Sequence, residues 1–543
     1  MSRSSMIRLR LPPGHQQIEL DQAVAEACGL SLNELKNKPY RIVRKSLDAR
    51  KKSSLVFEYL ISFESDATDS AGIRQLLPAV KGRFTQAVKQ PRPVVIGGGP
   101  AGLFAALALA MAGLCPLLIE RGEDVVSRGR KVERYWQSGQ LDTQSNVQFG
   151  EGGAGAFSDG KLTSHVKGEL ARRVLEELVL AGAPEDILFW SRPHIGTDRL
   201  RSVVIQIREK IISFGGEVWF NSCLTGFSVS QHKLASIQIR KTRGDRYEQM
   251  EIACSHMILA VGHSARDTYD MLFSQGLRME AKPFAMGVRL EHLRSDINTI
   301  QYGKQTDHRL LPAADYKFAV HLDQGITVYS FCMCPGGYVI ASASENGGIV
   351  TNGMSYHARS GINSNCGLLV TADPARFPHE GPLGGLSWQR QIEAKAFSSG
   401  GGQARAPVQR LHNFLGLEPD DDLFKQSRRI RSSDDDMLLQ PTYRPGVVWS
   451  EIADILPVYM VKALRDVWPA LNRKIPGFAD PMAILTAAET RSSAPLRILR
   501  DKDLQSNVPG LYPCGEGAGY AGGILSAATD GLRSAMALMS EIL

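Results

Sequence analysis

A glycine-punctuated apolar segment near residue 100 constrains the fold of this chain more than any other feature. It reads VVIGGGPAGLFAALALAMAGLCPLLIE from Val94 to Glu120. The β-branched run at 93–96 suits a short buried strand, glycines spaced as GxGxxG open a helix, and a second apolar run ends at an acid. This order of strand, glycine turn, helix and strand predicts a buried βαβ unit in a parallel sheet.

Each glycine of the motif has its own physical task. Gly97 permits a tight turn, Gly99 lets the backbone approach a pyrophosphate, and Gly102 lets the helix pack closely on the strand. The helix then begins at Pro100 and Ala101, and its N-terminus offers unpaired N–H groups to phosphates. Glu120 would accept hydrogen bonds from a ribose 2′-hydroxyl and would repel a 2′-phosphate. The segment therefore predicts a site for an adenine dinucleotide.

The same stretch has an alternative interpretation as a membrane-spanning helix. Val94 to Ile119 holds no charged residue and is long enough to cross a bilayer. Its Gly-Gly-Gly-Pro and Cys-Pro interruptions and its strand-helix-strand rhythm favour the βαβ unit instead.

Composition and charge set the broad class. With 543 residues, 43% hydrophobic and 22% charged, the chain is typical of a soluble protein of about three domains. No secretory signal is visible in the first residues, and the eight cysteines are spread singly, so we expect reduced thiols, a cytoplasmic protein and no metal site.

Residues 1–92 hold 16 Lys and Arg against 9 Asp and Glu, which accounts for the whole net charge of +7. A solvated basic face is the favoured interpretation, and an acidic partner or nucleic acid is the alternative.

Periodicity along the chain predicts five segments. Residues 1–66 form a basic α+β module of βαββ type, in which Ser31 and Glu34 make a capping box, and 67–92 form a linker. The first part of the nucleotide-binding domain follows at 93–274, a turn-rich substrate or cap domain at 275–480, and the C-terminal part of the nucleotide-binding domain at 481–543. The fold class is thus α/β, with a Rossmann-like domain, an inserted α+β domain and an N-terminal module.

Three further strings resemble a known family. They are NVQFGEGGAGAFSDGKL at 146–162, YSFCMCPGG at 329–337 and GLYPCGEGAGYAGGILSAATDGLRSA at 510–535, with KPFAMGVRLEH at 282–292 and AAETRSSAPLRI at 487–498. Over nearly the whole chain the sequence resembles the bacterial NAD(P)/FAD-dependent oxidoreductases called FAD-dependent dehydrogenases, which have the glutathione-reductase-like FAD fold and largely unassigned substrates. One departure is Val261 in AVG, where related flavoproteins often have Thr.

The resemblance implies FAD as the cofactor. Glu516 would reach the ribityl and phosphate side of FAD, with a helix N-cap as its alternative role. The helix that opens at Gly522, Gly523 and Ile524 would aim its N-terminus at the pyrimidine edge of the flavin. Other residues expected to contact the cofactor are Arg121, Arg128, Gly152, Gly153, Gly155, Lys161, Gly262 and Gly515.

The glycine-rich loop from Gly150 to Lys161 would lie beside the flavin. Lys161 would then approach the N1–C2 carbonyl side or enter the substrate pocket, and a flexible surface loop is the alternative. Its glycine density indicates close backbone approach to something flat or charged.

Catalytic residues are not identified by the sequence, and the candidates are weak. Cys332 and Cys334, at i and i+2, would share one face of a strand, which suits either a redox dithiol or pocket-lining thiols. His194 is an acid–base candidate or a structural histidine. Arg491 could clamp a substrate carboxylate, or pair internally with Glu489 or another neighbour.

These observations predict an FAD-dependent oxidoreductase that exchanges a hydride between the flavin and a small molecule. The chain has one dinucleotide fingerprint, so any NAD(P)H would bind transiently in the cap cleft, or another donor would replace it. The alternatives are a flavoprotein that acts on RNA through residues 1–92, whose strand offers Phe57, Tyr59 and Phe63, and a non-catalytic flavin-binding sensor. Substrate, direction of hydride transfer and oligomeric state are not specified by the sequence.

Overall fold

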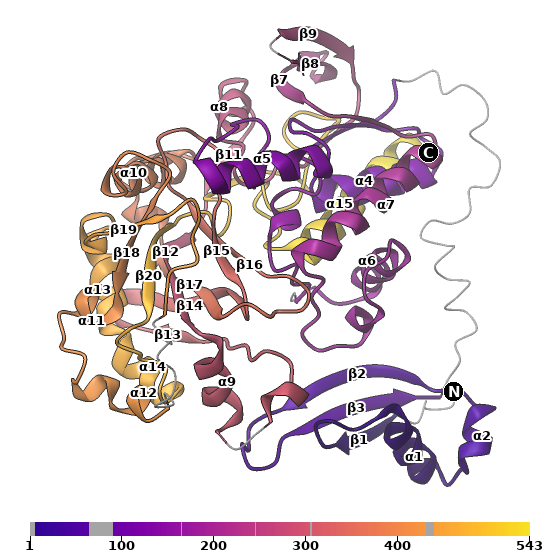
Figure 1. Ribbon diagram of the computed structural model, residues 1–543. Helices are drawn as coiled ribbons and strands as arrows, with labels where there is room; N and C mark the ends of the chain where they lie inside the picture. The colour runs from indigo at the N-terminus through magenta and orange to yellow at the C-terminus, as the bar shows by residue number, and fades with distance from the viewer. Residues whose placement is uncertain (1–5, 64–90, 164–165, 245, 305–306, 431–438) are drawn as a thin grey trace.

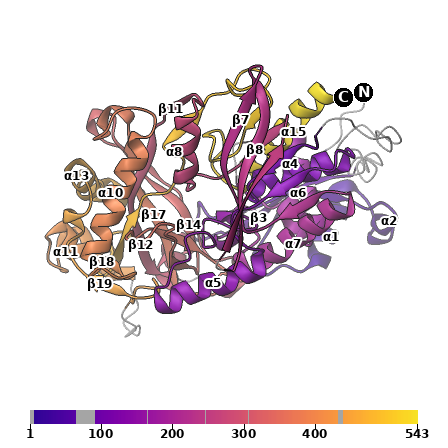
Figure 2. The ribbon, with the colours of Figure 1, turned by 90° about the horizontal axis from the view of Figure 1, so that it is seen from above.

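The computed structural model consists of two large domains lying side by side, with a small N-terminal module packed beneath them (Figures 1 and 2). It describes residues 6–63, 91–163, 166–244, 246–304, 307–430 and 439–543. Most of the expected linker at 67–92 therefore lies outside the described residues.

The N-terminal module has the predicted α+β architecture, including the short second helix that the Ser31 and Glu34 capping box predicts. Its elements are β1 (Ile7–Leu11), α1 (Gln17–Cys28), α2 (Leu32–Lys36), β2 (Arg41–Asp48) and β3 (Val56–Ser62), with an antiparallel strand order β1-β3-β2. The capping box is confirmed, because the backbone N–H of Glu34 donates to Ser31 Oγ (3.2 Å) and that of Ser31 to Glu34 Oε2 (2.7 Å).

Backbone hydrogen bonds fix this module on the nucleotide-binding domain. Lys45 on β2 donates its N–H to the carbonyl of Phe189 (2.8 Å) and accepts at its carbonyl from Ser191 (2.9 Å). Phe57 and Tyr59 on the central strand are buried, 7% and 3% exposed. Neither ring is free to stack on a base, so the RNA alternative loses two of its three aromatic residues.

The nucleotide-binding domain contains a fully parallel five-stranded sheet. Its strand order is β22-β10-β4-β5-β6, made by β4 (Val94–Ile96), β5 (Leu117–Ile119), β6 (Glu217–Trp219), β10 (Met257–Leu259) and β22 (Leu511–Pro513). Apolar side chains of α4 (Pro100–Met111), α6 (Glu169–Leu180), α7 (Thr197–Ser213) and α15 (Ile524–Ile542) form one core with this sheet. Another core contains side chains of the meander β7 (Ser222–Ser230), β8 (Lys233–Arg243) and β9 (Arg246–Ala253), and of α8 (Arg266–Ser274).

Further elements of this domain are α5 (Val125–Ser138) and the 3₁₀ helices η2 (Ala154–Phe157) and η3 (Glu185–Leu188). The segment from Val94 to Ile119 is strand, helix and strand, as the βαβ interpretation predicts. Within the described residues, no helix is long and apolar enough to cross a membrane.

The second domain is built on a seven-stranded sheet of order β13-β14-β17-β12-β20-β18-β19, in which only β18 and β19 pair in parallel. Its strands are β12 (Phe284–Leu293), β13 (Ala319–His321), β14 (Thr327–Cys334), β17 (Asn363–Ala372), β18 (Ala406–Arg410), β19 (Val447–Trp449) and β20 (Ile484–Glu489). A hairpin of β15 (Tyr338–Ala341) and β16 (Thr351–Met354) lies beside it.

Helices surround this sheet. They are α9 (Arg294–Tyr302), α10 (Gly384–Ser399), α11 (Leu411–Leu415), α12 (Lys425–Ile430), α13 (Val458–Asp466) and α14 (Trp468–Lys474). Short 3₁₀ turns occur at η4 (His308–Leu310), η5 (Asp323–Gly325), η6 (Pro374–Arg376), η7 (Asp422–Phe424) and η8 (Ile452–Asp454).

The boundaries expected at residues 275 and 481 are corrected by the sheet pairing. β20, expected in the nucleotide-binding domain, pairs with β12 and β18 inside the second sheet. At the other boundary, β11 (Met279–Ala281) pairs with β21 (Leu496–Ile498) in a two-stranded ribbon between the domains. The second domain therefore runs from β12 to the end of β20, and the chain returns to the nucleotide-binding domain only after it.

Candidate active site

A cavity of about 610 Å³ lies where the two domains meet. Its volume falls in the usual range for small-molecule and cofactor sites. The walls come from the glycine turn before α4, the ends of β5 and β10, the glycine-rich loop, β14 and the N-terminus of α15. Predicted residues that line it are Gly97, Gly99, Pro100, Ala101, Glu120, Arg121, Gly153, Gly155, Lys161, Gly262, Cys332, Arg491, Gly515, Glu516, Gly522, Gly523 and Ile524.

The glycine turn has the geometry that the motif predicts. Gly97 has φ +103°, and a Cβ there would meet the carbonyl oxygen of Ala260 at 2.3 Å. A Cβ on Gly102 would lie 1.8 Å from the carbonyl oxygen of Gly97, so only glycine lets the helix begin this close to the turn. Gly99 faces the cavity, and its nearest neighbour is the Cα of Gly153 at 3.7 Å from an added Cβ.

Glu120 lies on the cavity wall and also organises the backbone around it. Its Oε2 accepts from the N–H of Gly98 (2.5 Å), while Oε1 accepts from the N–H groups of Gly122 and Gly150, both at 2.9 Å. One carboxylate thus ties the glycine turn, the end of β5 and the glycine-rich loop together. A ribose hydroxyl would share oxygens that already hold the loop.

Arg128 has a different position from the one expected. The side chain is fully buried outside the cavity lining. Its guanidinium donates to the carbonyls of four residues in the glycine-rich segment: Asn146 (2.7 Å), Val147 (2.8 Å), Gly150 (3.2 Å) and Glu151 (2.7 Å). Arg128 therefore shapes the loop from behind, and burial lowers its pKa to about 9.

Gly152 likewise does not line the cavity. A Cβ on it would meet Ala156 and Val204, and its N–H donates to the carbonyl of Gly98 (2.8 Å), so it joins the loop to the glycine turn. The loop is therefore an ordered wall of the cavity rather than a flexible surface segment.

The C-terminal motif closes the cavity on the opposite side. Gly515 adopts φ +77° and donates its N–H to Asp530 Oδ2 on α15 (2.8 Å), while Asp530 also pairs with Arg500 (2.8 Å). Glu516 lies on the cavity wall, where burial raises the pKa of its carboxyl to about 7 in spite of Lys282. Ile524, the first residue of α15, lines the cavity, so the positive end of that helix points toward it.

Charged side chains gather along the wall near Lys161. Asp159 is fully buried and accepts from Arg359 Nη2 (2.6 Å), with Lys161 Nζ at 4.0 Å and a further hydrogen bond from Ser355. The nearby cations hold the pKa of Asp159 below its usual value, although burial opposes them. Arg192 and Lys317 line the same cavity.

Three of the candidate catalytic residues lie away from the cavity lining. His194 stacks on His357, with ring centroids 5.2 Å apart, and Cys334 lies behind Cys332 with 4.0 Å between the sulfur atoms. Glu489 is buried against Arg289, with Oε2 3.1 Å from Nε, and burial raises its pKa to about 8.

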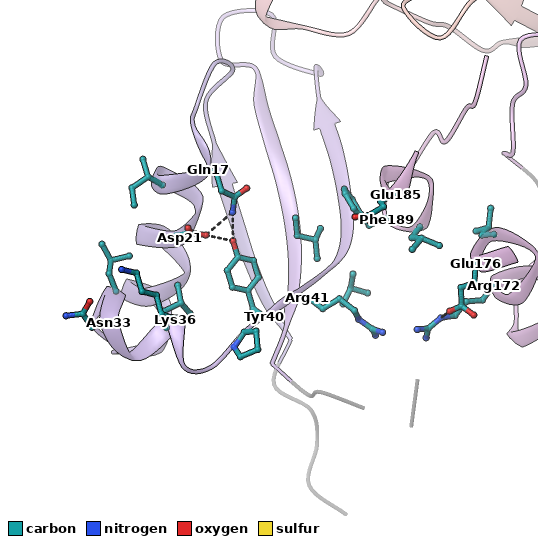
Figure 3. Close-up of a pocket in the computed structure, with 18 residues that line it drawn as sticks. Gln17, Asp21, Asn33, Lys36, Tyr40, Arg41, Arg172, Glu176, Glu185 and Phe189 are labelled. Atoms are coloured by element: carbon teal, nitrogen blue, oxygen red, sulfur yellow. Dashed lines mark hydrogen bonds and ion pairs between the residues drawn. The ribbon is translucent and has the colours of Figure 1, made fainter. Parts of the chain in front are cut away.

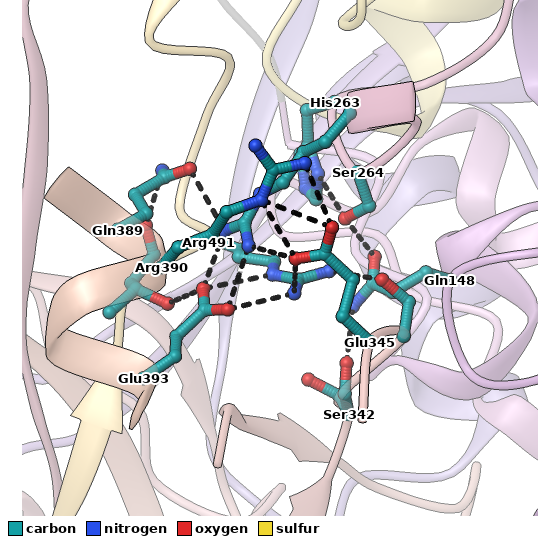
Figure 4. Close-up of polar contacts among 12 residues, drawn as sticks. Gln148, His263, Ser264, Ser342, Glu345, Gln389, Arg390, Glu393 and Arg491 are labelled. Carbon is teal, nitrogen blue, oxygen red and sulfur yellow. Dashed lines mark hydrogen bonds and ion pairs between the residues drawn. The ribbon is translucent and has the colours of Figure 1, made fainter. Parts of the chain in front are cut away.

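Arg491 lines the cavity but forms an internal ion pair, one of the two roles left open for it. Its partner is Glu393 on α10, with Nη2 2.9 Å from Oε2, and not Glu489. Figure 4 shows this cluster, which also includes Glu345 and Gln389.

Three cavity residues were missed at the level of sequence. His263 follows Gly262 at the carboxyl end of β10, a position where parallel sheets place ligand contacts, so its place in the chain was a usable signal. Asp159 stands inside the glycine-rich string, which was a second signal. Arg359 comes from a distant loop, and its approach depends on the packing of the second domain.

A larger cavity, of about 940 Å³, lies between the N-terminal module and the α6–η3 region (Figure 3). Hydrogen bonds in its wall join Gln17, Asp21 and Tyr40, and the Tyr40 hydroxyl donates to Asp21 Oδ1 (2.6 Å). Neither a glycine turn nor a predicted site residue is among its lining residues.

Comparison with known proteins gives two family matches. A family described as "FAD-dependent protein, C-terminal domain-like" matches residues 283–492, which agrees with the span from β12 to β20. A domain of unknown function matches residues 1–64. An uncharacterised protein of Clostridium beijerinckii is 45% identical over 509 residues, covering 91% of each chain.

Similar solved structures include two at low identity. The glycerol-3-phosphate dehydrogenase of Bacillus halodurans, complexed with FAD, has a TM-score of 0.31 and 12% identity, over 84% of this chain and 64% of that one. A geranylgeranyl bacteriochlorophyll reductase-like protein of Thermoplasma acidophilum has a TM-score of 0.35 and 13% identity, over 83% and 79%.

Proposed function

Because this chain belongs to the same family as the uncharacterised clostridial protein, and its residues 283–492 match a family of FAD-dependent proteins, we propose that the cavity binds FAD and oxidises or reduces a small molecule beside it. The observation that carries the proposal is the meeting of three backbone features in one cavity. These are the glycine turn before α4, the glycine-rich loop, and the N-terminus of α15.

The residues present fit a dinucleotide. The N–H groups that open α4 suit a pyrophosphate, Glu120 suits a ribose hydroxyl, and Gly99 leaves space for close approach. On the opposite wall, the positive end of α15 at Ile524 suits the edge of a flavin that gains negative charge on reduction. When bound, FAD supplies the two-electron chemistry, and the protein supplies orientation and charge.

The substrate would enter beside the second domain. That part of the cavity is lined by Lys161, Arg192, Lys317 and Arg359. Two acids line it as well: Asp159 pairs with Arg359, and Asp315 pairs with Arg192. The stretch from Val94 to Glu120 is the one glycine motif that we interpret as a dinucleotide fingerprint, so we propose that any NAD(P)H binds transiently in the same cavity. A flavin sensor without catalysis is the alternative, and it predicts bound flavin that no physiological donor reduces.

The first test is the absorption spectrum of the purified protein. We expect flavin bands that are released by denaturation and identified as FAD by chromatography. Apoprotein should bind FAD at least about 100-fold more tightly than FMN, because the adenosine half adds contacts at Glu120 and the glycine turn. A protein that stays colourless after incubation with FAD contradicts the proposal.

A pair of glycine variants makes this test specific. Gly99→Val places a branched side chain where the cavity wall must stay flat, so FAD binding should fall by at least about 100-fold. Gly129→Ala on α5 is the control, because its added Cβ meets only the end of the Arg201 side chain, at 3.7 Å. Anaerobic addition of NADH, NADPH and small hydroxy or unsaturated acids then reports which compounds bleach the flavin.

A further inference from the structure

Two cysteines at the cavity wall are brought together by an irregular strand. The pairing of β14 with β17 shifts register between Phe331 and Cys334. At this bulge Cys332 adopts φ +40°, a left-handed conformation that costs free energy for a residue with a Cβ and that clusters at functional sites. The two sulfur atoms lie 4.0 Å apart. Cys332 lines the cavity and Cys334 is buried behind it.

The charges around the pair favour a thiolate at Cys332. Arg289, fully buried, donates Nη1 to the carbonyls of Cys332 (2.9 Å) and Phe331 (3.3 Å). The Cys334 hydrogen bond and the Arg289 charge lower the pKa of Cys332 to about 6, although burial and Asp159 oppose them; Lys161 adds to the lowering. The pKa of Cys334 is raised by that same bond and by burial, so Cys334 keeps its proton.

The carboxyl group of Glu489 also faces Arg289. Burial raises the pKa of Glu489 to about 8, so near pH 7 much of this carboxyl is protonated and does not neutralise Arg289. The positive charge of Arg289 then stabilises the Cys332 thiolate. Cys366 on the adjacent strand is different. It accepts a hydrogen bond from the Tyr316 hydroxyl (3.1 Å), and burial raises the pKa of its thiol to about 12.

We propose that Cys332 and Cys334 form a redox-active dithiol that exchanges two electrons with the flavin of the same cavity. This inference rests on the proposed function. In the oxidising direction the Cys332 thiolate and the Cys334 thiol form one S–S bond, and the oxidised flavin takes up two electrons and the Cys334 proton. In the other direction the reduced flavin returns both electrons and that proton. The substrate class is therefore a thiol or disulfide compound that exchanges with this pair.

The tryptic peptide 318–359 allows the pair to be measured alone, because it contains no cysteine other than Cys332 and Cys334 and no internal Lys or Arg. Apoprotein equilibrated in mixtures of reduced and oxidised dithiothreitol, then trapped with iodoacetamide, should yield this peptide in two forms. One form carries two alkyl groups and the other carries none and an internal disulfide. If the peptide carries two alkyl groups in every mixture, so that no disulfide form is detected, the proposal is overturned.

Reactivity and flavin reduction give independent readouts. Iodoacetamide should modify Cys332 about 10-fold more slowly at pH 7 in Cys334→Ala than in the parent protein, because alanine has no donor for the thiolate. Cys366→Ala, the matched control, should leave that rate unchanged. In the FAD-loaded protein kept without oxygen, the prereduced dithiol should bleach up to one equivalent of flavin with loss of the two thiols, and Cys332→Ser should abolish this bleaching.

The two proposals fail in different ways. Bound FAD together with a dithiol that neither forms a disulfide nor bleaches the flavin overturns the dithiol proposal and leaves the flavoenzyme proposal standing. Absence of FAD binding overturns both.

Discussion

Gly102 shows how one missing Cβ determines the geometry of the candidate site. An alanine there would place its Cβ 1.8 Å from the carbonyl oxygen of Gly97, and this backbone atom cannot move without opening the turn. We expect Gly102→Ala to lower the free energy of unfolding by about 2–4 kcal/mol. Urea unfolding measures it. Gly129→Ala, also within a helix, should change stability by less than about 1 kcal/mol, and an equal loss in both variants would contradict the steric explanation.

His194 makes folding sensitive to acid. Burial, followed by the charge of Arg359, lowers the pKa of His194 to about 4, whereas an unfolded histidine titrates near 6.5. The unfolded chain therefore takes up the proton first, and stability present above pH 6.5 is lost as the pH falls toward 4. Between pH 8 and pH 5 this histidine should account for about 2 kcal/mol of lost stability.

Urea unfolding at several pH values tests this assignment. His194→Asn should flatten the pH dependence by that amount, while His232→Asn, in the exposed turn between β7 and β8, should leave the slope as it is. Equal slopes in the parent protein and His194→Asn would show that other groups dominate.

At the scale of elements, the glycine-rich loop depends on a helix that does not reach the cavity. Arg128 on α5 satisfies four carbonyls of this loop. Arg128→Met would leave them without that donor, and we expect a loss of about 3–5 kcal/mol together with weaker FAD binding. Arg130→Met, exposed on the same helix, should stay within about 0.5 kcal/mol. Urea unfolding and FAD titration compare the two; similar losses would mean that the loop does not need the guanidinium.

Local elements were predictable from the sequence where one physical pattern determined them. The βαβ unit and the Ser31 capping box follow from glycine spacing and capping chemistry. β20 was placed in the wrong sheet because a buried antiparallel strand and a buried parallel strand have similar apolar sequences. The role of Arg128 was missed for a related reason: a sequence gives no sign of which side of a loop an arginine approaches.

At the scale of the whole molecule, the two domains are joined by a buried ion cluster. Arg266 begins α8 in the nucleotide-binding domain. Glu393 lies on α10 of the second domain, and Arg491 follows β20 (Figure 4). Glu393 accepts from Arg266 Nη2 (2.6 Å) and from Arg491 Nη2 (2.9 Å). Because Arg491 lines the cavity, this cluster joins the second domain to the nucleotide-binding domain beside the candidate site. From the sequence, Glu489 or another neighbour was the expected ion-pair partner of Arg491. In the structure its partner is Glu393, about a hundred residues away in the chain.

Glu393 balances the charges of the two buried arginines in this cluster. The two arginines hold the pKa of Glu393 far below its usual value in spite of its burial, so its stabilising contribution is present at neutral pH and is lost only as the pH falls below the value of an unfolded glutamate. Among the described residues, Glu393→Gln leaves the half-exposed Glu345 as the carboxylate that pairs with the two buried guanidinium groups, and it should cost about 3–5 kcal/mol at pH 7. Asp466→Asn, which breaks the exposed Lys462–Asp466 pair on α13, should cost less than about 0.5 kcal/mol. Urea unfolding at pH 7 measures both variants, and a loss below about 1 kcal/mol for Glu393→Gln would show that the domains are held together by apolar contacts instead.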